Sequence, residues 1–241
     1  MKKSTYILLF FLGAAFVQAQ IQKSLECSYK IIVQDLTEEE LNAIKGENIK
    51  TSLINRLNES KKREFILKGN TLNAVFKETE RMRSDKDKSP TNHLGSDQYY
   101  YDVKSEKVYL FTEFSGTKYL VSNSFSLYNW EITNETKNID GFKCYKAKGT
   151  EIINDFREKK NYTLIAWFCP DLPFKYGPER YFGLPGLIFE AYTENSKEKY
   201  VLKSIKFSDE ITEIIKPKGK EITEQEFTTI FNKTMNSLYE D

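Results

Sequence analysis

The feature that most constrains the fold is a concentration of prolines late in the chain. Four of the six prolines lie between Pro170 and Pro185. Because proline has no backbone N–H to donate to a sheet ladder, this stretch cannot be a central strand. The flanking residues 162–168 and 186–193 are apolar and have the composition of strands. We therefore expect residues 170–185 to form an ordered loop across an edge or the mouth of a sheet.

The loop ends in the sequence Gly183-Leu184-Pro185-Gly186-Leu187-Ile188. Pro185 and Gly186 suit the two central positions of a type II turn, in which proline presets φ and glycine accepts a positive φ. Leu187 and Ile188 then enter a strand, and Leu184 is placed to fold under the turn. The segment is therefore predicted to be a structural motif that returns the chain to the sheet.

Local patterns outside this loop predict a β-rich domain. Residue types that favour a pleated sheet are abundant, and hairpin turns are expected at Gly69-Asn70, Asp140-Gly141 and Asn195-Ser196. Residues 162–168 carry bulky side chains on both faces, which indicates a strand in the middle of a sheet. The predicted fold is mainly β (α+β), with a single antiparallel, curved or half-barrel sheet of about ten strands.

Two helices are predicted to accompany this sheet. An early helix over residues 37–58 begins with a capping box of Thr37 and Glu40 and continues with apolar residues at helical spacing. Gly46 would break that helix in two. A C-terminal helix over residues 223–238 carries an apolar stripe along one face.

The N-terminal sequence predicts export. Lys2 and Lys3 precede a short apolar run and small residues lead up to Ala19, so we expect residues 1–19 to be a cleaved signal peptide and residues 20–241 to be a single domain. Removing the signal lowers the formal net charge from +1 to −1, which argues against nucleic acid as a partner. No later apolar stretch reaches spanning length, so the mature chain should have no transmembrane segment. The expected location is the periplasm or the cell exterior.

Three cysteines, Cys27, Cys144 and Cys169, bear on the redox state. An oxidising compartment permits one disulfide with one thiol left over. If residues 142–150 pair with 160–169, Cys144 lies near Cys169 on the neighbouring strand, and this is the leading candidate for a disulfide. Two alternatives stay open, namely Cys27 as a partner, or cysteines that are buried as small hydrophobic residues.

Candidate catalytic residues are few. His93 is the one histidine, which excludes a histidine-rich metal site and leaves a single base for any nucleophilic pair. No phosphate-binding, dinucleotide-binding or Cys-x-x-Cys motif occurs, so we expect no metal, no cofactor and no catalytic residue. Asp171, Glu179 and Arg180 in the proline loop are either functional acids beside an arginine or, as we favour, a loop salt bridge or simply solvated charges.

Aromatic residues supply the candidate binding surface for a ligand or partner. The residues singled out are Trp130, Trp167, Phe174, Tyr176, Tyr181 and Phe182. They would line a cavity under the proline loop, or they would pack the core, which is the commoner role of large aromatic side chains. The tyrosine run 99–101 offers either a contact surface or ordinary cross-strand packing.

Several short motifs occur in a fixed order along the chain, namely Gly141 to Ala147, Ala166-Trp167-Phe168, Pro173, Gly177-Pro178 and Gly183 to Ile188. In this order they resemble the motifs of the GLPGLI family of secreted Bacteroidota proteins. They lie within about residues 130–190. The resemblance implies a signal peptide followed by a β-rich body. The family has no established function, so it brings no catalytic residues that can be carried over.

We interpret the chain as an exported envelope protein without enzymatic activity. It would bind an apolar ligand such as a lipid, or a peptide or other envelope cargo, through the sheet and the 170–186 loop. One alternative is an interaction partner of an outer-membrane transporter or secretion system, which predicts an exposed apolar patch. Another is a hydrolase with an unrecognised site, which requires a polar cleft holding His93 or paired carboxylates.

Overall fold

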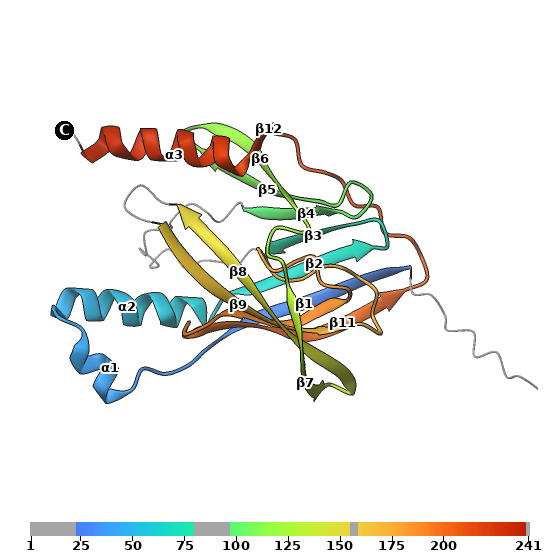
Figure 1. Cartoon of the computed structure of the whole chain (residues 1–241), viewed down its shortest axis with the longest axis horizontal. Coiled ribbons are helices and arrows are strands. Elements are labelled where there is room, and N and C mark those ends of the chain that lie inside the picture. Colours follow the sequence, from blue (N-terminus) through green and yellow to red (C-terminus); the bar gives the residue numbers. More distant parts are fainter. Residues whose placement is uncertain (1–22, 80–96, 155–158, 240–241) are drawn as a thin grey trace, which may run out of the picture.

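One open, curved sheet organises the protein (Figure 1). The computed structural model describes residues 23–79, 97–154 and 159–239, and this part holds twelve strands and three helices. The elements are β1 (Ser24–Val33), α1 (Glu38–Ala43), α2 (Glu47–Ser60), β2 (Glu64–Asn70), β3 (Asn73–Glu78), β4 (Gln98–Asp102), β5 (Lys107–Phe114), β6 (Thr117–Ser124), β7 (Glu131–Ile139), β8 (Phe142–Asn154), β9 (Lys159–Cys169), β10 (Leu187–Thr193), β11 (Glu198–Ser208), β12 (Lys220–Thr223) and α3 (Glu224–Tyr239). The predicted mainly β fold is confirmed.

The strand order is β12-β6-β5-β4-β3-β2-β1-β11-β10-β9-β8-β7. Neighbouring strands are antiparallel except β12 and β6, which run parallel with Thr223 beside Ser122. This edge pair departs from the antiparallel sheet predicted. Its cause is the 209–219 segment, which leaves β11 and crosses the sheet: the Thr212 N–H donates to Ser24 Oγ of β1 at 2.8 Å, and Ile214 packs on the outer side of β4 and β5. β12 is only four residues long, too short for alternation to predict it.

Turn residues fix most hairpins where they were predicted. Asp140 and Gly141 have φ of 50° and 84°, as a two-residue type I′ turn requires, and Asn195 has φ of 65°. The first hairpin turns later than predicted, because Gly69 and Asn70 belong to β2. The Asn70 side chain caps the turn that follows by accepting two backbone N–H groups.

The early helix is divided, as Gly46 indicated. Thr37 and Glu40 form the predicted capping box, in which the Glu40 N–H donates to Thr37 Oγ1 at 3.2 Å and the Thr37 N–H donates to Glu40 Oε2 at 2.9 Å. Gly46 adopts φ of 98° and separates α1 from α2, so the helix predicted over residues 37–58 is two helices. α3 starts from a second capping box at Thr223, and its apolar stripe packs on β5, β6 and β12.

Strand β9 has the central position that its bulky composition predicted, between β10 and β8. Leu164 and Ala166 are fully buried on one face, and Ile165 is buried on the other. In the part of the chain with assigned structure, no helix combines the length and the apolarity that crossing a membrane would take.

Candidate ligand-binding site

The proline loop fills the inside of the curved sheet. Three tyrosine hydroxyls join the loop or its end to separate strands: Tyr101 donates to the Gly177 carbonyl at 2.7 Å, Tyr29 to that of Ile188 at 2.7 Å and, from the loop itself, Tyr176 to that of Asn70 at 2.9 Å. Six loop side chains are nearly inaccessible, namely Leu172, Phe174, Tyr176, Tyr181, Phe182 and Leu184. The sheet therefore curls around a loop that supplies much of its core.

The six aromatic residues predicted to bind a ligand do not form one surface. Phe174, Tyr176, Tyr181 and Phe182 are 0–4% exposed and belong to this core. Trp130 is half-buried, and its indole N–H donates to the Phe182 carbonyl at 2.8 Å. Their structural role is therefore to anchor the loop, and a binding role for them stays a prediction.

Trp167 lies apart from the loop, among charged side chains of β7, β8 and β10. The Nζ of Lys137 stands 4.2 Å from the centre of the Trp167 ring and 2.7 Å from Glu190 Oε2. A second ammonium, that of Lys146, lies 6.0 Å from the same ring. This is a cation–π arrangement on the sheet surface, not the lining of a cavity under the loop.

The Gly183 to Ile188 segment does not form the predicted type II turn. The Gly186 N–H donates to the Leu184 carbonyl at 2.8 Å, which makes a γ-turn centred on Pro185 and replaces the expected type II turn. The residue with positive φ is Gly183, at 86°. A Cβ on Gly186 would come within 2.2 Å of the Cys169 carbonyl oxygen, so close backbone approach explains this glycine.

The three cysteines are free and buried. Cys144 on β8 and Cys169 on β9 lie on adjacent antiparallel strands. Each cysteine is next in sequence to a member of the pair Tyr145 and Phe168. The structure thus brings the predicted disulfide partners onto neighbouring strands but leaves both thiols unbonded. Burial, followed by the neighbouring Cys169, raises the pKa of Cys144 to about 12, so neither a role as a thiolate nor metal ligation is favoured there.

The tip of the proline loop carries a charge pair to a distant strand. The Arg180 Nη1 lies 2.9 Å from Glu151 Oε2 of β8, and this pair takes the place of the predicted salt bridge within the loop. Burial acts to lower the pKa of the Arg180 guanidinium. The Glu151 carboxylate has the opposite effect and the pKa is raised overall. Glu179 beside it has φ of 47°, a conformation that non-glycine residues adopt rarely. Asp171 is exposed at the start of the loop.

Asp97 brings a second carboxyl group to this tip. Burial raises the pKa of Asp97 to about 6, a hydrogen bond from Thr112 opposes the rise, and the charge on Glu179 adds to it. Its Oδ1 atom is buried and has no hydrogen-bond partner in the described residues. A carboxyl group that ionises near neutral pH beside other charges is a common property of functional sites.

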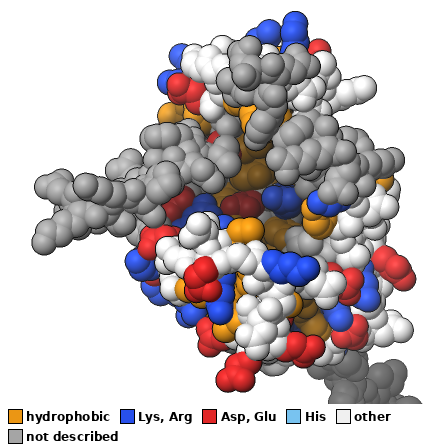
Figure 2. All heavy atoms as spheres, turned by 90° about the vertical axis from the view of Figure 1, so that its left-hand side faces the viewer, with side chains coloured by type: hydrophobic (Ala, Val, Ile, Leu, Met, Phe, Trp, Pro, Cys, Tyr) orange, Lys and Arg blue, Asp and Glu red, His pale blue; other side chains and the backbone are white. Residues whose placement is uncertain are grey.

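Two tyrosines complete the cluster. Burial raises the pKa of Tyr200 well above its ordinary value, and the charge and hydrogen bond of Glu179 raise it further. Burial, and then Glu179, likewise raises the pKa of Tyr99. We call Asp97, Tyr99, Glu151, Glu179, Arg180 and Tyr200 the mouth cluster. Figure 2, which views the molecule from the left-hand side of Figure 1, shows a hollow with acidic, basic and hydrophobic side chains at its floor.

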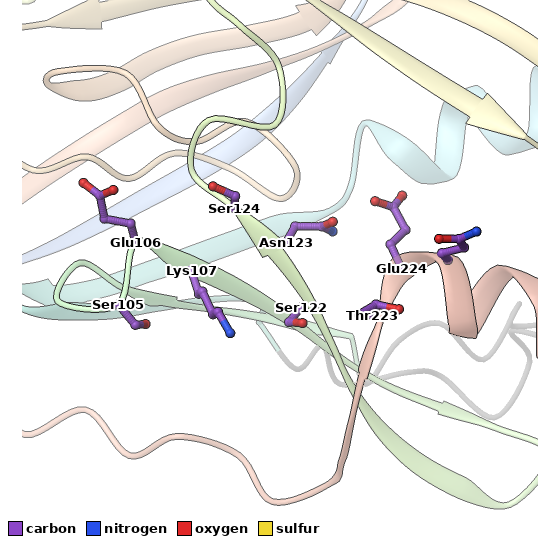
Figure 3. A pocket seen from close by; sticks show the side chains of 9 residues that line it. Ser105, Glu106, Lys107, Ser122, Asn123, Ser124, Thr223 and Glu224 are labelled. Atoms are coloured by element: carbon purple, nitrogen blue, oxygen red, sulfur yellow. The ribbon is translucent and has the colours of Figure 1, made fainter.

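An open pocket of about 510 Å³ lies at the start of α3 (Figure 3). It is lined by Ser105, Glu106, Lys107, Ser122, Asn123, Ser124, Thr223, Glu224 and Gln225. Glu224 connects the two regions, because burial and then the charge of Glu151 raise its pKa while Arg180 opposes the rise. Its side chain is nevertheless exposed along the pocket, and Figure 3 shows Asn123 pointing toward it.

The arrangement suits recognition of a polar molecule better than nucleophilic chemistry. Arg180 forms an ion pair with Glu151, and the Glu179 carboxylate accepts a hydrogen bond from Tyr200, so these charges have partners. The hydrolase alternative called for a polar cleft with His93 or paired carboxylates. His93 lies outside the described residues, whereas Asp97, Glu151 and Glu179 do gather here. Among the residues with described placement, no group of histidine, cysteine and acidic side chains could hold a metal ion.

Sequence reasoning missed Asp97, Glu151 and Glu224. The sequence contained a signal for Asp97 and Glu151. Residues two positions apart in a strand share a face, so Glu151 lies on the face of Gly149 and Asp97 on the face of Tyr99. An acid at a core-facing position of a strand is unusual and can mark a site. For Glu224 no such signal exists, since acids near a helix start are common.

Comparison with known proteins finds a partial family match and a likeness in fold. Residues 130–190 match a family described as a protein of unknown function, Porph_ging. No curated protein matches. Two solved structures of PNGF-II, in space groups C2 and P21, are similar to 86% of this chain, with TM-scores of 0.53 and identities of 13% and 14%. The chain spans about a third of their length, 32% and 33%, so the likeness concerns the fold alone.

Proposed function

We propose that this is an exported, non-enzymatic binding protein of the cell envelope that holds a polar ligand at the open end of its curved sheet. The observation that carries the proposal is the mouth cluster. Charged and phenolic groups from β4, β8, β11 and the loop converge there at the surface of an otherwise aromatic interior. Assembling partly buried charges costs free energy, and a binding site is one reason to retain them.

The packing of the proline loop favours a polar ligand over the apolar ligand expected from the sequence. An apolar ligand would need the space that Phe174, Tyr176, Phe182 and Leu184 occupy, since all four are at most 2% exposed. The accessible pocket next to the cluster is lined by polar residues throughout. The predicted signal peptide supports export to the periplasm or beyond.

Native mass spectrometry tests the binding function. Protein isolated from its own envelope should carry a bound molecule, and Glu224→Gln should reduce its occupancy because it removes charge at the junction of pocket and cluster without changing size. The matched control is Glu113→Gln, at an exposed position of β5 outside the pocket. Wild-type protein that is never loaded, or equal loading of both variants, would overturn the proposal.

A hydrolase is the second candidate, and Asp97 is the observation that favours it. A carboxyl group with a pKa of about 6 could serve as a general acid or base at neutral pH. Turnover of any ester, amide or glycoside that disappears in Asp97→Asn, with the fold intact, would replace the binding function with this one.

The transporter-partner alternative rests on exposed apolar residues at one end of the sheet. Leu72, Ile211 and Ile215 are 61%, 71% and 76% exposed. Leu72 and Ile211 belong to neighbouring segments, because the Asn70 side chain donates to the Thr212 carbonyl at 2.8 Å. Capture of an outer-membrane protein by crosslinking at Ile211 would favour this role.

A further inference from the structure

The outer side of the sheet, which faces away from the proline loop, carries a dense set of lysines. Alternation along β1 turns Tyr29 and Ile31 into the core and leaves Lys30 and Ile32 on the outer side, where Ile32 is 46% exposed. The registers of β11, β2 and β3 place the outer residues of those strands beside them. We call the charged and aliphatic members of this surface the outer lysine face, namely Glu26, Lys30, Ile32, Glu64, Ile66, Lys68, Val75, Lys77, Lys199, Val201, Lys203 and Lys206.

The outer lysine face is positive. Its six lysines and two glutamates give a formal charge of +4. Lys203 forms an ion pair with Glu64 at 2.7 Å, and Lys68 forms one with Glu26 at 2.8 Å. Both glutamates therefore already have a close partner, and the excess charge belongs to the other lysines.

Three of those lysines are free to meet a partner. Lys30 and Lys77 are exposed and form no ion pair with any described residue. The Lys206 side chain is 77% exposed, and its Nζ lies 3.9 Å from the Glu26 carboxylate. At the border of the face, Glu190 of β10 lies between Lys137 and Lys199 and does not reach these three.

Acidic groups gather at a different place. The mouth cluster holds Asp97, Glu151 and Glu179 with one arginine, Arg180. The formal charge of the whole chain is only +1, so it does not reveal that a positive outer face and an acidic mouth are separated. Only the strand register brings the lysines together.

The lysines are spread too widely to hold one small anion. Neighbouring strands lie about 4.8 Å apart, so the four strands from Lys77 on β3 to Lys199 on β11 make an array about 14 Å wide. Separated ammonium groups in such an array suit a partner that is itself an extended surface of negative charge.

Aliphatic side chains lie between the ammonium groups. Ile66 is beside Lys77, and Val201 is beside Lys30. The outward residues of these four described strands include neither arginine nor an aromatic ring, which are the groups on which nucleic-acid bases stack. Apolar groups among lysines instead match the boundary between lipid headgroups and acyl chains.

We propose that the outer lysine face docks the protein on an anionic lipid surface. The ammonium groups would meet lipid phosphates, and the aliphatic side chains would enter the headgroup region. The proposal adds a second surface to the molecule and uses only the envelope location of the proposed function. Tyr99 and Tyr200 of the mouth cluster pack against the core on the inner side of the sheet, so docking would leave the mouth accessible.

Cosedimentation with vesicles tests the proposal, with protein recovered from the envelope so that all variants share one N-terminus. Wild-type protein should sediment with vesicles made of equal parts of phosphatidylglycerol and phosphatidylcholine, and should stay in solution with phosphatidylcholine alone. Raising the salt from about 0.1 M to about 1 M shortens the Debye length from about 10 Å to about 3 Å and should release the protein.

The triple variant Lys30→Gln, Lys77→Gln, Lys206→Gln removes the three free charges of the face. Near an anionic surface each lysine contributes roughly fivefold to binding, so the affinity for anionic vesicles should fall about a hundredfold. The circular dichroism spectrum should stay native, because none of these side chains is buried.

The matched control is the triple variant Lys45→Gln, Lys104→Gln, Lys233→Gln. It removes the same net charge at exposed positions outside the four strands and should bind vesicles like wild type. Because both triple variants have the same total charge, a difference between them reports the location of the lysines and not the net charge of the protein.

Ile32→Thr separates a lipid surface from a soluble polyanion. It keeps the β-branched shape and the charge but removes apolar surface, so vesicle affinity should fall about threefold while binding to dextran sulfate stays unchanged. The proposal is overturned if anionic and neutral vesicles bind alike, if the two triple variants behave alike, or if dextran sulfate binds more tightly than vesicles and Ile32→Thr affects neither. Each of these outcomes leaves the mouth-cluster binding function standing, because that function is tested separately by the loading of Glu224→Gln.

Discussion

Arg180 at the tip of the proline loop lies 2.9 Å from Glu151 on β8 and ties the loop to a strand near the far edge of the sheet. The Glu151 side chain is 13% exposed and that of Arg180 is 39% exposed, so water screens the pair only in part. The same two residues act on Glu224, at the start of α3. The pair thus stands where elements far apart in the sequence meet around the mouth cluster.

Removing Arg180 should destabilise the protein by leaving Glu151 partly buried and unpaired. For Arg180→Met we expect the free energy of unfolding, measured in urea, to fall by about 2 kcal/mol. Arg180→Met with Glu151→Gln should recover part of that loss. Lys203→Met is the control, because Lys203 and its partner Glu64 are both half exposed, and it should cost less than about 1 kcal/mol. Equal losses for the two single variants would contradict a special role for the Arg180 pair.

Asp97 should make the protein less stable as the pH rises. Its folded pKa of about 6 exceeds the ordinary value of 3.8, so the folded state holds the proton more tightly than the unfolded state does. This contribution is complete below about pH 4 and is lost as the pH rises through 6. Melting temperatures of Asp97→Asn should therefore decline less between pH 4 and 7 than those of wild type. Parallel curves would show that Asp97 does not titrate in this range.

Gly183 should tolerate alanine poorly. A Cβ there would lie 2.1 Å from the Phe125 carbonyl oxygen, and the positive φ adds strain. Gly141 has nearly the same φ, but a Cβ on it would meet nothing within 4 Å. Gly141→Ala therefore measures the backbone strain without a steric clash. We expect a loss of about 1 kcal/mol for Gly141→Ala and at least about 3 kcal/mol for Gly183→Ala, by chemical denaturation. Similar stability losses for the two variants would mean that the loop can move away from Phe125 at little cost in free energy.

The cysteines should be unreactive until the protein unfolds. All three are buried, and the raised pKa of Cys144 keeps it protonated. Without reductant, a thiol reagent should label none in native protein and all three in guanidinium chloride. Labelling of a single thiol after unfolding would instead establish a disulfide, with Cys144–Cys169 as the first pair to test by peptide mapping.

Local sequence patterns predicted the elements well because they depend on neighbouring residues. The Thr37–Glu40 capping box, the Asp140-Gly141 turn and the central position of β9 are each set by side chains a few positions apart. The γ-turn at Pro185 was missed, because Gly186 is required by its approach to Cys169 and not by its own φ. The mouth cluster was missed for a related reason, since its members come from β4, β8, β11 and the loop.

The sequence by itself determined a β-rich chain with an ordered proline loop, because proline excludes a ladder strand and alternation marks the strands around it. Only the tertiary structure decided that the loop fills the sheet with its aromatic residues and presents Glu179 and Arg180 at the mouth. Burial and the electrostatic surroundings of a side chain are set by residues distant in sequence, such as Glu151 for Arg180 and Thr112 for Asp97. A local pattern contains no record of those neighbours.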